Sequence, residues 1–210
     1  MDTKPVLFLD FDGLKFDTLD IHVRYINHRY GISTVPADYI DNPGLEDVIK
    51  KYFDQKHHHL IDRDEVYLDV GERLIASLEW HKDVPPIPGM AEIIPLLAKK
   101  YTLWTVTARQ KTSLPVVKHM LDTYVPNCIS GVHCVWEHLG EKRWKEVSKK
   151  QFIEQFPGPK VAFIDDSPKE ILRMEGIIST YLFDRHGMHS NASGITNIVR
   201  TWHEIGKVFL

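Results

Sequence analysis

One stretch decides the fold of this 210-residue chain: Pro5-Val6-Leu7-Phe8-Leu9-Asp10-Phe11-Asp12-Gly13. Its apolar part, residues 5–11, is typical of a strand that is buried on both faces of a parallel sheet. Two carboxylates, Asp10 and Asp12, stand at the end of this strand, and Gly13 allows the chain to turn sharply beneath them. Because the same pattern can also be a simple turn that ends a strand, the other strand ends of the chain must distinguish the two.

Two further apolar stretches end in a similar way. Residues 102–106 lead to Thr107, and residues 161–164 lead to the adjacent acids Asp165 and Asp166. In open α/β sheets ligands bind beyond the carboxyl ends of the strands, so we expect the three strand ends to meet at one crevice. The four carboxylates would repel one another there, and a divalent cation would relieve the repulsion. Carboxylate oxygens suit Mg²⁺, which predicts a magnesium site.

Strand and helix patterns alternate along the chain, which predicts an α/β fold with a doubly wound, mostly parallel, Rossmann-like sheet. We expect strands over residues 5–11, 102–107, about 131–135, 160–165 and 179–183. Helices are expected between them, notably over residues 89–100 and 113–124.

One connection is too long for a simple crossover. About ninety residues separate the first two strands, whereas a strand–helix–strand crossover needs only about a dozen. Residues 19–85 carry helical periodicity, for instance at Val66, Val70 and Leu74, and almost no strand pattern. We therefore expect a small helical cap at residues 19–85, inserted after the first strand into a core formed by residues 1–18 and 86–210.

The residues at the expected crevice suit phosphoryl transfer. Asp10 can attack phosphorus as a carboxylate nucleophile, while Asp12 handles the proton of the leaving group. The hydroxyl of Thr107 and the backbone amides of Ala108 and Arg109 could bind phosphate oxygens. The guanidinium of Arg109 could add a charge-assisted hydrogen bond to the substrate or to a carboxylate.

A cation is expected in the lysine-rich stretch that precedes the last acidic pair. Ser148 and Gln151 have the spacing of a capping box, which predicts a helix that begins beside the crevice. Lys149 would lie in the first turn of this helix. We favour Lys149 as the cation of the site, with Lys150 next and Lys145 third.

In this order, the four segments resemble the four motifs of the haloacid dehalogenase (HAD) superfamily, whose largest class is the Mg²⁺-dependent phosphatases. Residues 87–97, which lead to residues 104–107, also resemble the family's approach to its second motif. The likeness covers residues 1–18 and about 86–186, and it does not extend to the cap. The chain departs from the common pattern at Leu14, where a threonine usually follows the glycine.

The resemblance implies a role for each motif residue. Asp10 would be the nucleophile and a metal ligand, and Asp12 would be the acid/base, whose backbone carbonyl also binds the metal. Thr107 would bind phosphate, and Lys149 would steady the charged nucleophile and the transferred phosphoryl group.

The acidic residues also bear on the type of reaction. Of the last pair, Asp166 matches the direct metal ligand better, with Asp165 close by. The dehalogenases and phosphonate-cleaving members of the family lack an aspartate at the position of Asp12, so its presence favours phosphate chemistry.

The predicted function is that of a Mg²⁺-dependent phosphomonoester hydrolase that acts through an aspartyl-phosphate on a small phosphorylated metabolite. A nucleotide is one candidate substrate, because residues 182–185, Asn191 and residues 199–205 resemble the tail of some 5′-nucleotidase-like members. Two alternatives stay open. One is a sugar-phosphate mutase or other phosphotransferase, and the other is a non-catalytic binding module on the same fold.

The bulk composition bears on the partners. The net charge of −3 gives no electrostatic footprint for duplex nucleic acid, which speaks against a nucleic-acid partner. No apolar run approaches the roughly 18 residues of a membrane span, and the first strand begins too early to leave room for a signal peptide. We therefore expect a cytoplasmic monomer or homodimer with no membrane partner.

Overall fold

The computed structural model describes residues 4–39, 45–52, 62–139, 144–187, 189 and 193–210. Its centre is a seven-stranded sheet with the strand order β4-β3-β2-β1-β5-β6-β7. Neighbouring strands are parallel, except for β3 and β4, which are antiparallel. The predicted α/β fold with a doubly wound, mostly parallel sheet is confirmed.

The strands are β1 (Val6–Leu9), β2 (Thr102–Gln110), β3 (Ile129–His138), β4 (Trp144–Glu146), β5 (Lys160–Asp165), β6 (Ser179–Phe183) and β7 (Ile198–Val199). The α-helices are α1 (Leu19–Tyr30), α2 (Leu45–Tyr52), α3 (Arg63–Asp69), α4 (Leu78–His81), α5 (Met90–Lys100), α6 (Leu114–Tyr124), α7 (Lys149–Gln155), α8 (Pro168–Arg173) and α9 (Trp202–Phe209). A π-helix (Val70–Ile75) lies between α3 and α4, and 3₁₀-helices span Pro36–Tyr39 and Lys111–Ser113.

The five strands expected from the sequence are all present, although their bounds differ by a few residues. Strand β3 is longer than expected and extends to His138, where it pairs with the short strand β4. Strands β4 and β7 have three and two residues. Segments this short carry too little of the alternating pattern to be recognised in the sequence.

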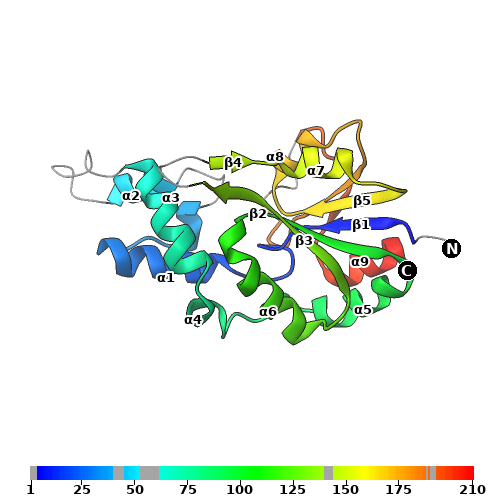
Figure 1. The fold of residues 1–210 in the computed structure, drawn as a ribbon, viewed down its shortest axis with the longest axis horizontal. Coiled ribbons are helices and arrows are strands. Elements are labelled where there is room, and N and C mark those ends of the chain that lie inside the picture. Colours follow the sequence, from blue (N-terminus) through cyan, green and yellow to red (C-terminus); the bar gives the residue numbers. More distant parts are fainter. Residues whose placement is uncertain (1–3, 40–44, 53–61, 140–143, 188, 190–192) are drawn as a thin grey trace.

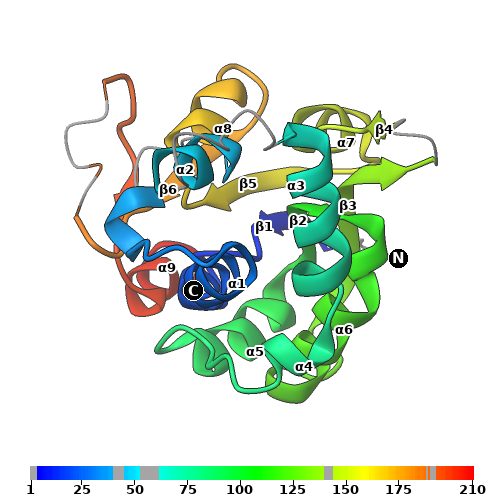
Figure 2. The ribbon, with the colours of Figure 1, turned by 90° about the vertical axis from the view of Figure 1, so that its left-hand side faces the viewer.

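The sheet is covered by helices on both faces, which explains the apolar character of β1. Figures 1 and 2 show α7 and α8 on one face and α5, α6 and α9 on the other. Leu7 and Leu9 belong to the larger apolar cluster, together with residues of α5, α6 and α9. Val6 and Phe8 belong to the second cluster, with residues of α7 and α8. All four side chains of β1 are therefore buried, two on each face.

The helices from α1 to α4 form a group at one end of the sheet, which we call the helical insert. Figure 1 shows the insert at the end toward which the carboxyl ends of the parallel strands point. The division into a core and a cap with bounds at residues 18 and 86 stays a prediction. Asn191, part of the resemblance to nucleotidase-like tails, lies outside the described residues. Among the described residues, no helix has the length and apolar character needed to cross a membrane.

Candidate active site

The register of the central strands brings the predicted motif residues to one edge of the sheet. Strand β1 lies between β2 and β5, with Leu9 opposite Thr105 on one side and Ile164 on the other. The residues that follow these positions therefore emerge together. Asp10 comes directly after β1, and Asp165 ends β5.

Three carboxylates gather at this edge. Asp10, Asp165 and Asp166 each offer an oxygen atom within 4.8 Å of those of the other two. Burial is the main cause that raises the pKa of each carboxyl group; other acids of the site raise the pKa values of Asp10 and Asp166 further, and Glu170 does so for Asp165. The pKa of Asp10 is raised to about 7. Negative charge at this site is therefore incompletely balanced by the protein.

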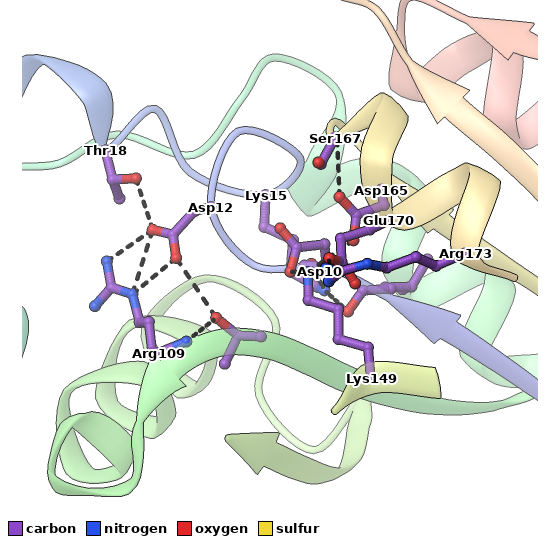
Figure 3. A network of polar contacts seen from close by, with 12 residues as sticks. Asp10, Asp12, Lys15, Thr18, Arg109, Lys149, Asp165, Ser167, Glu170 and Arg173 are labelled. Atoms are coloured by element: carbon purple, nitrogen blue, oxygen red, sulfur yellow. Dashed lines mark hydrogen bonds and ion pairs between the residues drawn. The ribbon is translucent and has the colours of Figure 1, made fainter. Parts of the chain in front are cut away.

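Lys149 supplies positive charge directly to this cluster. Its Nζ donates to Oδ1 of Asp10 at 2.6 Å and to Oδ2 of Asp165 at 2.7 Å, as Figure 3 shows from close by. Burial alone would lower the pKa of Lys149, but the two carboxylates outweigh it and raise this pKa. Of the three lysines considered from the sequence, Lys149 lies among the acids, whereas Lys150 and Lys145 are exposed.

A capping box fixes the place of Lys149. The hydroxyl of Ser148 accepts a hydrogen bond from the backbone amide of Gln151, and the side chain of Gln151 accepts one from the amide of Ser148. Helix α7 therefore begins at Lys149, as the spacing of these two residues predicts.

The adjacent acids of β5 have different surroundings. Both oxygens of Asp165 have protein partners, since Oδ2 accepts from Lys149 and Oδ1 accepts from the amide of Ser167. The carboxylate of Asp166 lies directly over Gly13, so close that a Cβ at Gly13 would be 1.8 Å from Oδ2. Within the described ranges, no hydrogen bond links Asp166 to another residue. Its oxygens are free to bind an ion.

This group of side chains fits a magnesium ion. Asp10 and Asp165 are buried, Asp166 is half-buried, and all three carboxyl groups have raised pKa values, so a divalent cation would balance charge that the protein leaves unbalanced. Carboxylate oxygens are also the ligands that Mg²⁺ takes in phosphoryl-transfer sites.

Asp12 lies beside this cluster but has other partners (Figure 3). Nε and Nη2 of Arg109 donate to Oδ2 and Oδ1 of Asp12 at 2.9 and 2.8 Å, and the hydroxyl of Thr18 donates to Oδ1 at 2.6 Å. Burial would raise the pKa of Asp12, but the Arg109 guanidinium outweighs it and holds this pKa well below its usual range. Asp12 is thus an ionised, firmly oriented carboxylate.

The predicted phosphate-binding segment lies next to Asp12. Thr107 is fully buried, and its hydroxyl accepts a hydrogen bond from the amide of Arg109 at 3.2 Å. The same hydroxyl lies 3.5 Å from Oδ2 of Asp12. Ala108 is exposed. In this arrangement both the amide and the guanidinium of Arg109 have protein partners.

The sequence pattern did not identify Lys15 as a site residue. Its side chain is fully buried, and Nζ donates to the backbone carbonyls of Leu9, at 3.2 Å, and of Asp10. Burial is the main cause that lowers the pKa of Lys15, to about 7. The sequence feature that could have identified Lys15 is its place between the apolar residues Leu14 and Phe16, two residues after the glycine of the first motif.

Among the comparisons with known proteins, the matches to solved structures agree with the sheet topology. No protein-family model and no curated protein matches this chain. A Clostridium difficile protein provisionally named a phosphatase has 18% identity and a TM-score of 0.69, with 100% of each chain covered. A hydrolase of the haloacid dehalogenase-like family from Streptococcus pneumoniae has 16% identity and a TM-score of 0.66, again with 100% of each chain covered.

A third solved structure contains a metal ion. A Bacillus subtilis protein provisionally named an HAD hydrolase, whose structure holds bound magnesium, has 15% identity and a TM-score of 0.60, with 99% of each chain covered. At such low identities these matches establish the fold. The chain has the fold of the haloacid dehalogenase superfamily, so the resemblance seen in its sequence motifs is confirmed at this level.

Proposed function

We propose that the protein is a Mg²⁺-dependent phosphomonoester hydrolase that acts through an aspartyl-phosphate on Asp10. The observation that carries this proposal is the buried contact between Lys149, Asp10 and Asp165, with Asp166 beside them, at the carboxyl edge of the sheet. A buried carboxylate that is held by one ammonium group and lies next to other acids is costly to keep unless it has a chemical use.

In the first step, a carboxylate oxygen of Asp10 forms a bond to phosphorus, and the bond between phosphorus and the leaving-group oxygen breaks. For this step Asp12 must carry a proton, which it gives to the leaving oxygen, so its ion pair with Arg109 forms only after that proton has left. Lys149 keeps Asp10 in place and balances its charge, as the 2.6 Å contact between them supports. The product of this step is a phosphorylated Asp10 and an ionised Asp12.

In the second step, a water oxygen forms a bond to phosphorus, and the bond between phosphorus and Asp10 breaks. Asp12 takes a proton from the water, and inorganic phosphate is released. The ion pair of Asp12 with Arg109 matches the ionised state that Asp12 has between the two steps. The hydroxyl and amide groups around Thr107 would bind the phosphate oxygens.

The metal site belongs to the same proposal. Asp10 and Asp166, with the backbone carbonyl of Asp12, would hold Mg²⁺, and Asp165 would support them through Lys149 and Ser167. When bound, the ion neutralises charge on the transferred phosphoryl group. The bound magnesium in the Bacillus subtilis structure of the same fold supports this assignment.

We assign the role of a cap to the helical insert, because it lies over the end of the sheet where the site is (Figure 1). A cap that closes over the site excludes water and suits a small phosphorylated metabolite. A nucleotide is one such substrate. The cytoplasmic location predicted from the sequence is consistent with a metabolite of this kind.

Phosphate release from a panel of phosphorylated metabolites, including nucleoside 5′- and 3′-monophosphates, tests the proposal. We expect release with Mg²⁺, none with EDTA, and none from Asp10→Asn. Asp20→Asn is a matched control, because Asp20 is an exposed acid on α1 that pairs with Arg24. Release that persists in Asp10→Asn would contradict the proposed nucleophile. Isomerisation without phosphate release would favour the phosphotransferase alternative.

A further inference from the structure

Arg109 is a buried cation that serves two groups of partners. Its side chain is 3% exposed. Nε and Nη2 form a fork on the two oxygens of Asp12, at 2.9 and 2.8 Å (Figure 3). A bidentate pair of this kind fixes the orientation of a carboxylate as well as its position. The guanidinium also packs over the ring of Phe11, with Cζ 4.8 Å from the ring centre.

The other partners of Arg109 belong to the helical insert. Nη2 lies 3.0 Å from Nε2 of His81 in α4, and Nη1 donates to the carbonyl of Ile75 at 3.4 Å. A guanidinium can only donate, so Nε2 of His81 must accept. The proton of the imidazole is then on Nδ1, which donates to the carbonyl of Ser77 at 2.8 Å. His81 is 1% exposed, and it therefore presents a fixed acceptor to Arg109.

The next residue along β2, Gln110, also contacts the insert. Its Nε2 donates to the carbonyl of Tyr67 at 3.1 Å. Gly71 of the π-helix lies so close that a Cβ there would be 1.9 Å from this nitrogen. π-helices are rare and often occur at functional sites. The insert thus contacts the end of β2 at two consecutive residues.

One guanidinium therefore joins Asp12 to the insert. If the insert moves away, Arg109 loses His81 and the carbonyl of Ile75, and its donors are left without those partners in a buried place. Such a loss is costly, so the side chain would turn toward water. Asp12 would then lose the fork that orients it. The position of the insert and the orientation of Asp12 are linked for this reason.

We propose that Arg109 is a positioning residue that orients Asp12 for the attack of water while the helical insert is docked, and that His81 is its partner in the insert. This inference rests on the phosphatase activity proposed above, because it concerns the second of the two steps. In that step the water oxygen bonds to phosphorus, the bond to Asp10 breaks, and a proton passes from water to Asp12.

Two variants separate this role from general stability. His81→Leu removes the acceptor of Arg109 and leaves the fork partners, Arg109 and Asp12, in place. Tyr25→Phe is the matched control, because it removes a partly buried hydrogen bond of the insert, from Tyr25 to Asp69 at 2.8 Å, that does not reach Arg109. A third variant, Arg109→Lys, keeps the charge and loses the fork.

The kinetic test uses p-nitrophenyl phosphate, whose leaving group departs without a proton. The first step then does not need Asp12, whereas the second step does. We expect kcat to fall about tenfold in His81→Leu and in Arg109→Lys, with KM falling by the same factor, because the aspartyl-phosphate accumulates. An initial burst of p-nitrophenol should accompany this change. Tyr25→Phe should keep the wild-type kcat and KM.

A second measurement does not depend on activity. The Nε–H of Arg109, buried on Asp12, should exchange slowly with solvent in an NMR spectrum, and its signal is identified by its loss in Arg109→Lys. We expect His81→Leu to speed this exchange about tenfold or more, since it removes a partner that holds the buried side chain, and Tyr25→Phe to leave it unchanged.

The outcomes distinguish this inference from the proposed function. A fall of kcat/KM in His81→Leu without a burst, or unchanged Nε–H exchange in that variant, would overturn the role of Arg109 while the loss of turnover in Asp10→Asn still supports the phosphatase. If the wild-type protein releases no phosphate from any ester, the proposed function fails, and the role of Arg109 in the water step fails with it.

Discussion

Lys149 and Lys150 are adjacent in the sequence but have opposite surroundings. Lys149 is buried between Asp10 and Asp165, and Lys150 is exposed. Replacing each by methionine keeps an unbranched side chain, one atom shorter, and removes its charge. We expect Lys149→Met to lower kcat by roughly 10²–10³, the usual cost of losing one preorganised charge contact at a reacting group, and Lys150→Met to change it by less than about twofold.

Phosphate release with Mg²⁺, measured on the two variants side by side, checks this expectation. Thermal unfolding of both proteins serves as the control, because a variant that does not fold says nothing about catalysis. A larger loss in Lys150→Met than in Lys149→Met would show that the cation of the site has been wrongly assigned.

At the residue scale, the sequence predicted best where a local rule fixes a side chain. The capping box at Ser148 places Lys149 at the start of α7, and that rule involves only neighbouring residues. For Arg109 the sequence offered a hydrogen bond to the substrate or to a carboxylate, but it could not say that the carboxylate is Asp12 or that His81 is a further partner, because these residues come from different parts of the chain. Lys15 was passed over because burial of a lysine goes against its usual preference for water.

The turn that follows β1 is an element whose backbone shape decides the site. Gly13 has a φ of +66°, and the carboxylate of Asp166 occupies the place of a Cβ. Gly31, at the end of α1, has a similar φ of +64°, and a Cβ added there would meet nothing within 4 Å. The left-handed backbone would strain an alanine at either position. Only at Gly13 would the methyl group of alanine also collide with Asp166.

We expect Gly31→Ala to lower the free energy of unfolding by about 1–2 kcal/mol, the cost of a left-handed conformation for an L-residue, and Gly13→Ala to lower it by at least as much, because the added methyl group also collides with Asp166. Only Gly13→Ala should also weaken Mg²⁺ binding, because the added methyl group displaces Asp166. Calorimetric titration with Mg²⁺, together with thermal unfolding of both variants, measures the two effects separately. Equal Mg²⁺ affinities in the two variants would contradict a role of Asp166 as a direct ligand.

At the element scale, the long strands and helices follow from apolar periodicity, whereas two local features do not. The π-helix has the same spacing of apolar residues as the helical pattern around Val66, Val70 and Leu74. Its wider turn becomes visible only in the structure, for instance in the hydrogen bond from the amide of Ala76 to the carbonyl of Gly71. Gly71 and Gln110 are far apart in the sequence and meet only in the folded chain, so no local sequence pattern predicts their close contact.

The arrangement of the whole molecule places an acidic site at the edge of a sheet that is covered on both faces. The layers seen in Figure 2 bury the strands, and the register of β1 with β2 and β5 brings acids that lie far apart in the sequence together. The sequence predicted the layers and the meeting of the strand ends. It could not predict how closely the acids approach, because that distance depends on the packing of all three strands.

The burial of these acids makes the stability of the metal-free protein sensitive to pH. The pKa of Asp10 is raised from 3.8 to about 7 by burial, and those of Asp165 and Asp166 are raised in the same direction. A raised carboxyl pKa means that the folded state binds protons more tightly than the unfolded state. The stabilisation from these protons is present below about pH 4 and is lost as the pH rises through about 7.

Mg²⁺ should replace the protons that are lost, so its effect on stability should grow as the pH rises. We expect Mg²⁺ at about a hundred times its Kd to add about 2.7 kcal/mol at pH 8, which corresponds to roughly 5–10 °C in Tm, and to add much less at pH 5. Thermal unfolding at both pH values, with Mg²⁺ or with EDTA at matched ionic strength, measures the difference. Asp166→Asn should shrink the gain at pH 8. A gain that is equal at the two pH values would mean that Mg²⁺ and protons do not compete for these carboxylates.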